Sequence, residues 1–221
     1  MGSCQPKLTQ LQRDILEAFF AGETQFALTG GTALGGFHLG HRQSQDLDLF
    51  ARPPATLESA ERALQAAASD CAAELVTEQR FPEFRRFRAA RGDDATIIDL
   101  AIDRAPAVDP SPVRFGSIRV HSLREIAANK ICTLLSRSEI RDLVDLKALL
   151  EAGTDLEQAL TDAEHKDGGV NPATLAWLLS ELSIAPDAPI PGDLPASELD
   201  SFREALVRRL RTLAFPERNR R

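Results

Sequence analysis

The stretch that most constrains the fold is LTGGTALGGFHLGHRQSQDLDLF, residues 28–50, because it places two aspartates one residue apart within an apolar run. Side chains alternate along a strand, so Asp46 and Asp48 share one face while Leu47 and Leu49 take the other. Two carboxylates this close repel each other unless a cation joins them. Oxygen ligands suit Mg²⁺ or Mn²⁺, so the sequence predicts a divalent metal site at Asp46 and Asp48.

A third carboxylate lies in ATIIDLAID, residues 95–103, which also alternates like a strand. If this strand lies beside the first, Asp99 joins Asp46 and Asp48 in one cluster. Three carboxylates can hold two metals about 4 Å apart for an in-line phosphoryl displacement. We therefore expect all three aspartates to bind metal, with Asp99 also acting as the base for the attacking hydroxyl.

The paired glycine Gly30–Gly31 follows a short apolar run and precedes a predicted helix. Glycine lets backbone amides approach phosphate oxygens closely, and a helix N-terminus favours an anion. The pattern predicts that Gly30 and Gly31 cradle phosphate, with Thr32 adding a hydroxyl. A tight turn is the alternative explanation for the glycines alone, so the combination with the acidic strand carries the prediction.

Hydrophobic periodicity predicts a mixed first half and a helical second half. Helices are expected over residues 7–21, 32–39, 56–71, 122–137, 141–152, 154–166, 172–182 and 196–215, and strands over 26–28, 45–50, 74–79, 83–90, 96–103 and 113–120. Trp177 is expected in the core of the C-terminal helices.

The opening stretch resembles the first motif of the polymerase-beta-like nucleotidyltransferase superfamily and, in detail, the AbiEii/AbiGii toxin family. The shared residues are Gly30–Gly31, His41–Arg42, and Ser44 with Asp46 and Asp48. The IIDL segment containing Asp99 resembles the third metal carboxylate of that superfamily. EIAANKICTLLSRSEIRDLVDLKALL, residues 125–150, resembles the family's helical motif, with a lysine on one helix and an Arg–Asp pair opening the next.

The resemblance implies an α+β fold, in which a polymerase-beta-like nucleotidyltransferase core with a small mixed sheet flanked by helices precedes a C-terminal helical bundle. Residues 1–121 are expected to form the core and residues 122–221 the helical region, with 122–150 completing the active site. The implied activity is magnesium-dependent transfer of a nucleoside monophosphate from an NTP to an acceptor. Some family members are toxins of toxin–antitoxin or phage-exclusion pairs, so a cognate antitoxin is an expected partner, and some modify tRNA.

Further site residues follow from the matched motifs. We expect Lys130 to neutralise the triphosphate, and Arg42, Ser44 and Arg137 to contact it. Asp142 and Asp145 lie one helical turn apart, where they can orient Lys130 or Arg137 or accept a proton from the acceptor. An exposed lysine and acids favoured by a helix N-terminus are the ordinary structural alternatives.

The formal net charge of −7 excludes a protein that is basic all over. Arginines nevertheless cluster locally, and such clusters can attract a polyanion while the whole chain stays acidic. The two clusters are Arg85, Arg86, Arg88 and Arg91, and Arg208, Arg209, Arg211, Arg218, Arg220 and Arg221. They motivate RNA, and tRNA in particular, as the acceptor, with solvated arginine surfaces as the alternative.

Location is predicted from what the sequence lacks. No apolar run approaches the ~18 residues of a membrane span, and the N-terminal residues do not resemble a signal peptide. The three cysteines, Cys4, Cys71 and Cys132, are too scattered for a disulfide framework or a zinc motif. We therefore expect a cytoplasmic protein with no membrane association.

Three other functions share part of this pattern. A non-catalytic nucleotide-binding module on the same fold has less reason to keep facing carboxylates. An antibiotic-type nucleotidyltransferase shares the metal site and differs in its acceptor. A metal-dependent phosphohydrolase usually adds histidine ligands, and no histidine pair at ligand spacing occurs here.

Overall fold

In the computed structural model, which describes residues 7–215, the chain divides into two compact units. The core unit contains the residues up to Ala105 together with Asp109–Ser122. The helical unit contains Pro106–Val108 and the residues from Leu123 onwards. The predicted α+β fold with a C-terminal group of helices is confirmed.

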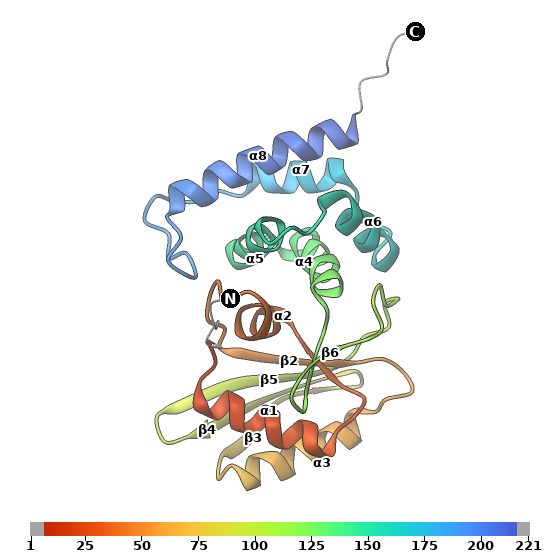
Figure 1. Ribbon diagram of the computed structural model, residues 1–221, viewed down its shortest axis with the longest axis vertical. Coiled ribbons are helices and arrows are strands. Elements are labelled where there is room, and N and C mark those ends of the chain that lie inside the picture. The colour runs from red at the N-terminus through yellow and green to blue at the C-terminus, as the bar shows by residue number, and fades with distance from the viewer. Residues whose placement is uncertain (1–6, 216–221) are drawn as a thin grey trace. The chain divides into compact units, whose positions relative to one another are not determined.

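The core unit is built on one mixed sheet of seven strands (Figure 1). The strands are β1 (Ala27–Thr29), β2 (Asp46–Ala51), β3 (Glu74–Phe81), β4 (Phe84–Arg91), β5 (Asp94–Ile102), β6 (Val113–Phe115) and β7 (Ile118–Val120). Their order is β3-β4-β5-β2-β1-β7-β6. The pairs β2–β5 and β1–β7 are parallel, and the other neighbours are antiparallel.

Helices cover both faces of this sheet (Figure 1). α1 (Gln10–Gly22) and α3 (Leu57–Asp70) pack together and against one face, and α2 (Gly30–Ala33) lies on the other and continues as a π-helical turn, Leu34–His38. Leu47 and Leu49 of β2 are fully buried, whereas Asp46 and Asp48, which alternate with them, are partly exposed. The alternation predicted for this strand is confirmed, and it turns the carboxylates to the face on which α2 lies.

Local chemistry explains where several elements begin and end. α1 begins at Gln10 rather than at residue 7 because Thr9 and Gln12 form a capping box. β4 and β5, which correspond to two of the predicted strands, form a hairpin with Gly92–Asp93 as a two-residue turn between paired Arg91 and Asp94. Gly92 has φ +59°, which favours glycine in such a turn.

Two glycines shape the backbone of this unit, and one of them overturns a prediction. The single strand predicted over residues 113–120 is wrong, because the chain turns at Gly116 (φ +63°) and forms the antiparallel pair β6–β7. Gly35 lies in the π-helical turn, where a Cβ would overlap the backbone carbonyl of Arg42. That glycine therefore allows a close approach to the segment that leads into β2.

The helical unit contains α4 (Leu123–Arg137), α5 (Ile140–Glu151), α6 (Leu156–Lys166), α7 (Pro172–Glu181) and α8 (Ala196–Ala214). α4 contacts α5 and α6, and α7 packs along α8. Buried Glu125 accepts hydrogen bonds from Lys166 Nζ (2.6 Å) and from the backbone N–H of Val108 (2.8 Å). The hydrogen bond from Val108 attaches the 106–108 segment to the helices, and the ion pair with Lys166 balances the charge of Glu125.

Trp177 was predicted in the core, and this prediction is wrong because its side chain is 61% exposed. Leu175 and Leu179 fill the buried side of α7, one turn apart. Trp177 lies midway between them and points away from that side. Within residues 7–215, no helix combines the length and apolar character needed to cross a membrane.

Candidate active site

Four residues lie side by side across four neighbouring strands of the core sheet. Thr29 of β1 is in register with Asp48 of β2, Asp48 with Asp99 of β5, and Asp99 with Arg86 of β4. We call Thr29, Asp48, Asp99 and Arg86 the cross-strand row. Because in-register partners share a face, all four side chains rise from the same side of the sheet.

The three aspartates predicted to act together therefore come from two adjacent parallel strands. Asp46 precedes Asp48 by two residues on β2, where it is paired with Ile97 of β5. Neighbouring strands lie about 4.8 Å apart, so Asp48 and Asp99 are close at their α carbons. Asp99 is almost fully buried, with 7% of the residue exposed.

The glycine pair packs directly against this row. Gly30 has φ +68°, and a Cβ there would overlap Oδ2 of Asp48. A Cβ on Gly31 would lie 2.6 Å from Nη2 of Arg42 and 2.9 Å from Oγ of Ser44. Only glycine leaves room for the carboxylate on one side and for the Arg42 and Ser44 side chains on the other.

Two threonines flank the glycines and differ in their hydrogen bonds. Thr32 Oγ1 donates to the backbone carbonyl of Asp46 at 2.5 Å, which ties α2 to β2. Thr29 Oγ1 is buried and has no hydrogen-bond partner among the residues described. A buried hydroxyl without a partner is costly, and this one shares a face with Asp48. The structure thus leaves an unsatisfied oxygen beside the carboxylates.

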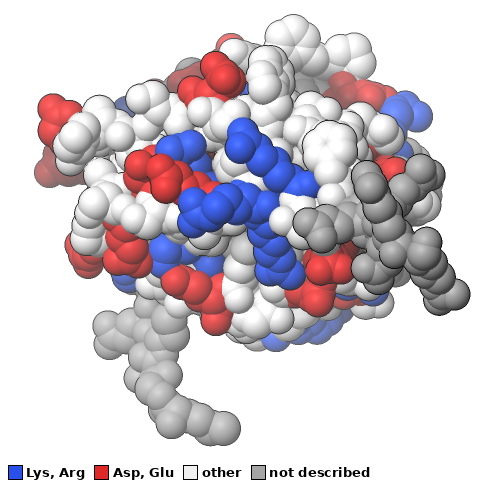
Figure 2. Space-filling view, turned by 90° about the horizontal axis from the view of Figure 1, so that it is seen from above, with Lys and Arg blue, Asp and Glu red and all other residues white. Residues whose placement is uncertain are grey.

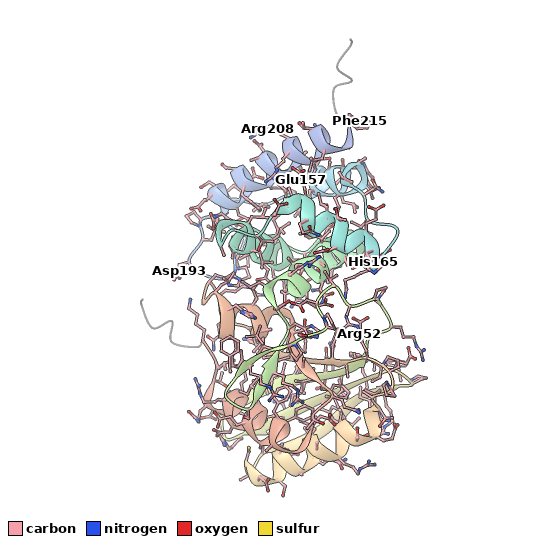
Figure 3. The ribbon with its side chains drawn as sticks, turned by 45° about the vertical axis from the view of Figure 1, so that its right-hand side comes forward. Arg52, Glu157, His165, Asp193, Arg208 and Phe215 are labelled. Carbon is pink, nitrogen blue, oxygen red and sulfur yellow. The ribbon has the colours of Figure 1, made fainter. Side chains whose placement is uncertain are left out.

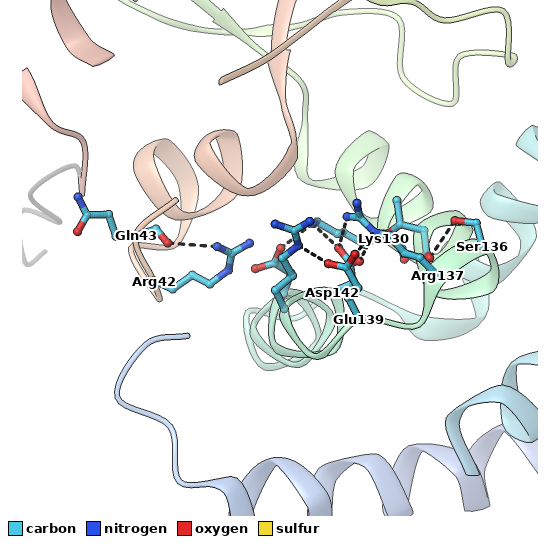
Figure 4. Close-up of polar contacts among 10 residues, drawn as sticks. Arg42, Gln43, Lys130, Ser136, Arg137, Glu139 and Asp142 are labelled. Carbon is cyan, nitrogen blue, oxygen red and sulfur yellow. Dashed lines mark hydrogen bonds and ion pairs between the residues drawn. The ribbon is translucent and has the colours of Figure 1, made fainter. Parts of the chain in front are cut away.

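The segment before β2 is held from two sides. Arg42 is buried and donates from Nη1 to the carbonyl of Gln43 at 3.1 Å (Figure 4). Gln12 of α1 is also buried, and its amide donates to the carbonyl of Ser44 at 3.0 Å and to Thr96 Oγ1 at 3.3 Å. The sequence analysis missed Gln12. A polar residue within the apolar face of a predicted helix was the available signal.

Arg86 is the second residue that the sequence analysis missed at this site. Its Nε donates to Asp99 Oδ1 at 2.8 Å and its Nη2 donates to Asp99 Oδ2 at 2.7 Å. The bonds to Asp99, with the charge of nearby Asp46, raise the pKa of the Arg86 guanidinium above its ordinary value. The third carboxylate is therefore held by an arginine on the adjacent strand.

The oxygen atoms on this face are of the kind that bind divalent metals. Carboxylate oxygens of Asp46, Asp48 and Asp99 and the unsatisfied hydroxyl of Thr29 are the hard ligands that Mg²⁺ and Mn²⁺ prefer. As the side chains stand in residues 7–215, no three or more His, Cys, Asp or Glu side chains are grouped as a metal site. The bonds between Asp99 and Arg86 are consistent with that finding.

In the helical unit, the predicted residues of α4 and α5 form one ionic cluster, in which Lys130, Asp142 and Asp145 are buried and Arg137 is exposed (Figure 4). Lys130 Nζ lies 2.8 Å from Asp142 Oδ1 and 2.6 Å from Asp145 Oδ2. Arg137 donates twice to Asp142, from Nε at 2.8 Å and from Nη2 at 3.1 Å. Asp142 and Asp145 are fully buried, so they are not the solvated acids of an ordinary helix N-terminus.

Electrostatics in this cluster favour charged carboxylates. Burial alone would raise the pKa of Asp142, but hydrogen bonds and charge from Arg137 and Lys130 outweigh it. The net pKa of Asp142 therefore lies below its ordinary value. The arrangement fixes Lys130 in position between two carboxylates.

Three of the four arginines in the first cluster form ion pairs within the core unit, and Arg88 is exposed. Arg85 is buried and pairs with Glu58 and Glu61 of α3, and Arg86 pairs with Asp99. Arg91 Nη2 lies 2.8 Å from Asp14 Oδ2. These side chains are used within the core unit because β4 alternates between the α3 face and the carboxylate face.

The second cluster lies partly on α8. Arg208, Arg209 and Arg211 are exposed there, and Figure 2 shows basic side chains gathered on the face seen from above. Arg208 projects from the outer side of the helix (Figure 3). Arg208 Nη1 lies 3.7 Å from Glu204, and Arg209 Nη2 lies 3.7 Å from Glu157, which are loose surface pairs. Arg218, Arg220 and Arg221 lie outside the described residues.

The chain was compared with protein-family models, curated proteins and solved structures. The family model "Nucleotidyl transferase AbiEii toxin, Type IV TA system" matches residues 14–220. JHP933 from Helicobacter pylori has a similar structure, with a TM-score of 0.57 and 21% identity over 92% of this chain and 91% of that one. An H. pylori protein described as a candidate nucleotidyltransferase has a TM-score of 0.58 and 21% identity, covering 92% and 95% of the two chains. No curated protein matches the chain.

The family match and the shared fold define a nucleotidyltransferase. The chain belongs to the AbiEii family of nucleotidyltransferase toxins from type IV toxin–antitoxin systems. The family resemblance inferred from residues 28–50, 99 and 125–150 is thereby confirmed.

Proposed function

We propose that this nucleotidyltransferase moves a nucleoside monophosphate from an NTP to an RNA acceptor, with tRNA as the expected target, and that it requires Mg²⁺ or Mn²⁺. The observation that carries the proposal is the register of Asp48 with Asp99 on parallel strands, beside a glycine pair that packs against Asp48. Two carboxylates in register do not help to stabilise a sheet, because like charges directly opposite each other are destabilising. Their placement is therefore better explained by a function.

In this proposal Asp46, Asp48 and Asp99 hold the metal. A bound divalent ion supplies Lewis-acid stabilisation of the phosphates and lowers the pKa of the attacking hydroxyl. Asp99 accepts the proton of that hydroxyl. Gly30 and Gly31 let the backbone approach the phosphates, while the hydrogen bond from Thr32 to the Asp46 carbonyl keeps α2 in place against β2.

The remaining predicted residues act by charge and position. Arg42 and Ser44, which lie against Gly31, contact the triphosphate. Lys130 neutralises triphosphate charge, and Asp142 and Asp145 hold its ammonium group in place. Arg137 shares Asp142, so it contributes to the same positioning and to phosphate contact. This role of residues 122–150 rests on the family resemblance.

Charge distribution supports RNA as the acceptor. Residues 206–221 contain six arginines and one acid, Glu217, giving +5, so the other residues carry −12 of the total −7. Within this segment, Arg208, Arg209 and Arg211 are exposed on α8. Phosphate binding by arginines releases counterions and gives affinity for a polyanion that falls with salt. A basic segment in an otherwise acidic protein is suited to this task.

The acceptor is tested by label transfer. The protein is incubated with each α-³²P-NTP in turn, Mg²⁺ and total RNA, beside a variant with Arg208, Arg209 and Arg211 all changed to Gln. A variant with exposed Arg62, Arg104 and Arg114 changed to Gln has the same net charge and serves as the control. We expect label in a tRNA-sized band, with the KM for RNA raised about tenfold in the α8 variant only.

Other outcomes of this experiment identify the rivals. Label on a small molecule instead of RNA would indicate an antibiotic-type transferase. Magnesium-dependent NTP binding without any transfer would indicate the non-catalytic module. An equal KM for RNA in the α8 variant and its control would show that the arginines of α8 do not bind the RNA.

Membership of a type IV toxin–antitoxin family also bears on partners. We propose that the protein acts as the toxin in the cytoplasm and is paired with a cognate antitoxin. Co-expression with the candidate antitoxin should restore growth to cells that the protein alone inhibits. Growth inhibition that no neighbouring gene relieves would contradict the pairing.

A further inference from the structure

Arg86 and Asp99 form the best-defined ion pair at the carboxylate face. β4 runs antiparallel to β5 and places Arg86 opposite Asp99, so the guanidinium reaches both carboxylate oxygens at 2.8 and 2.7 Å. This is the planar, two-bond geometry in which arginine binds carboxylates most strongly. Both oxygens that a metal would use are therefore occupied by hydrogen bonds from the protein itself.

The two partners differ in their surroundings. The Asp99 side chain is 9% exposed, whereas the Arg86 side chain is 38% exposed. Arg86 also lies near the ring of Phe84, with Cζ 5.7 Å from the ring centroid. A guanidinium that leaves Asp99 can thus remain over an aromatic face and in contact with solvent. Asp99, by contrast, needs another cation if Arg86 leaves, because an unpaired buried carboxylate is costly.

We propose that Arg86 is the resting counter-ion of Asp99 and competes with a divalent metal for it. The inference rests on the proposed metal-dependent transfer. In the resting protein, Asp46 and Asp48 take one metal ion, and Asp99 becomes a ligand only when Arg86 gives up its bonds. An incoming triphosphate supplies negative charge that draws Arg86 off Asp99, so occupation of the second metal position follows nucleotide binding. Arg86 is in this sense a positioning residue.

Mn²⁺ binding measures this competition directly, without a reaction. Free Mn²⁺ is followed by electron paramagnetic resonance during titration of the whole chain, with no nucleotide present. The variants are Arg86→Gln, Arg86→Lys and Asp99→Asn. Arg88→Gln is the matched control, because Arg88 is exposed and lies two residues along β4 on the same face.

The wild-type protein is expected to bind one Mn²⁺ without nucleotide and a second with a non-hydrolysable NTP analogue. Arg86→Gln should bind two without the analogue, and its second Mn²⁺ should bind about tenfold more tightly than in the wild type, because one opposing positive charge is gone. Arg86→Lys keeps the positive charge but cannot form two parallel hydrogen bonds with Asp99. Its affinity for the second Mn²⁺ should therefore lie between those of the wild type and Arg86→Gln. Arg88→Gln should match the wild type. In Asp99→Asn, adding Arg86→Gln should give no further gain.

Thermal unfolding of each variant confirms that it is folded before titration. Unchanged or weaker Mn²⁺ binding in folded Arg86→Gln would overturn the inference, since Arg86 would then hold Asp99 in place or have no effect. If the wild type nevertheless binds Mn²⁺ and Asp46→Asn abolishes that binding, the proposed metal site would still stand. Absence of Mn²⁺ binding in every variant, with or without the analogue, would overturn both proposals.

Discussion

Asp48 and Asp99 lie opposite each other on the parallel strands β2 and β5, with Thr29 beyond Asp48 on one side and Arg86 beyond Asp99 on the other. The cross-strand row therefore consists of a neutral hydroxyl, two carboxylates and a positively charged guanidinium, in that order. Asp99 has both oxygens bonded to Arg86, whereas the Asp48 carboxylate packs against Gly30. The two aspartates thus have different surroundings, although they occupy equivalent positions on the sheet.

Replacing Gly30 by alanine should damage both the fold and the site. The backbone at Gly30 has φ +68°, which costs a non-glycine residue about 1 kcal/mol or more, and the new Cβ would displace the Asp48 carboxylate. We expect transfer activity to fall about 100-fold, as for other small misplacements of reacting groups.

Gly116→Ala is the matched control, because Gly116 has φ +63° but a Cβ added there would meet no heavy atom within 4 Å. It should lose about 1 kcal/mol of unfolding free energy and keep its activity. Urea denaturation and initial rates measure both effects. Equal activity losses in the two variants would mean that backbone strain, and not contact with Asp48, is responsible.

Thr29 and Thr32 should respond in opposite ways to substitution by valine. Thr32→Val removes the hydrogen bond to the Asp46 carbonyl and should cost about 1–2 kcal/mol of unfolding free energy. Thr29→Val removes a buried hydroxyl that has no partner among the described residues, so stability should be unchanged or rise by up to about 1 kcal/mol.

For Thr29→Val we expect Mg²⁺-NTP binding to weaken about tenfold despite the preserved stability, because the buried hydroxyl lies in register with Asp48 and has no partner among the described residues. Calorimetric titration with a non-hydrolysable NTP analogue measures this. Loss of stability together with unchanged binding would show instead that Thr29 serves the fold.

The buried cluster of α4 and α5 should make stability depend on pH. The folded pKa of Asp142 is lowered, so this carboxyl contributes stability above its unfolded pKa and loses it as pH falls through the folded value. Asp142→Asn does not titrate and should be about 3 kcal/mol less stable than the wild type near neutral pH.

The difference in unfolding free energy between wild type and Asp142→Asn should therefore stay constant down to the ordinary pKa of Asp, about 4, and shrink as the pH falls further toward the lower folded pKa of Asp142. Urea denaturation at several pH values gives this difference. A difference that stays constant over the whole range would contradict the pairing of Asp142 with Lys130 and Arg137.

Much of the acidic face could be predicted from sequence because a period of two is a local property. Alternation in DLDLF orients Asp46 and Asp48, and a second alternating segment supplies Asp99. The partner of Asp99 could not be predicted, because it depends on the register of β4 against β5. The arginines of β4 were interpreted as one cluster, whereas the strand sends Arg85 to α3 and Arg86 to Asp99.

The other differences arise from one local turn and from packing between elements. The segment 113–120 has strand composition throughout, and only the positive φ of Gly116 divides it. Trp177 is apolar, but the buried side of α7 is already filled by Leu175 and Leu179. The full burial of Asp142 likewise depends on Lys130 from another helix. None of these contacts leaves a periodic signal in the chain.

The most direct measurement uses NTP labelled at either the α or the γ phosphorus, with Mg²⁺ and RNA, for the wild type and Asp48→Asn. The account predicts that α-label becomes attached to the acceptor while γ-label leaves as pyrophosphate. Asp48→Asn should slow both about 100-fold or more, since each tenfold corresponds to about 1.4 kcal/mol of lost metal stabilisation. Release of γ-label as phosphate without attachment of α-label would indicate a hydrolase, and full transfer by Asp48→Asn would contradict the carboxylate site.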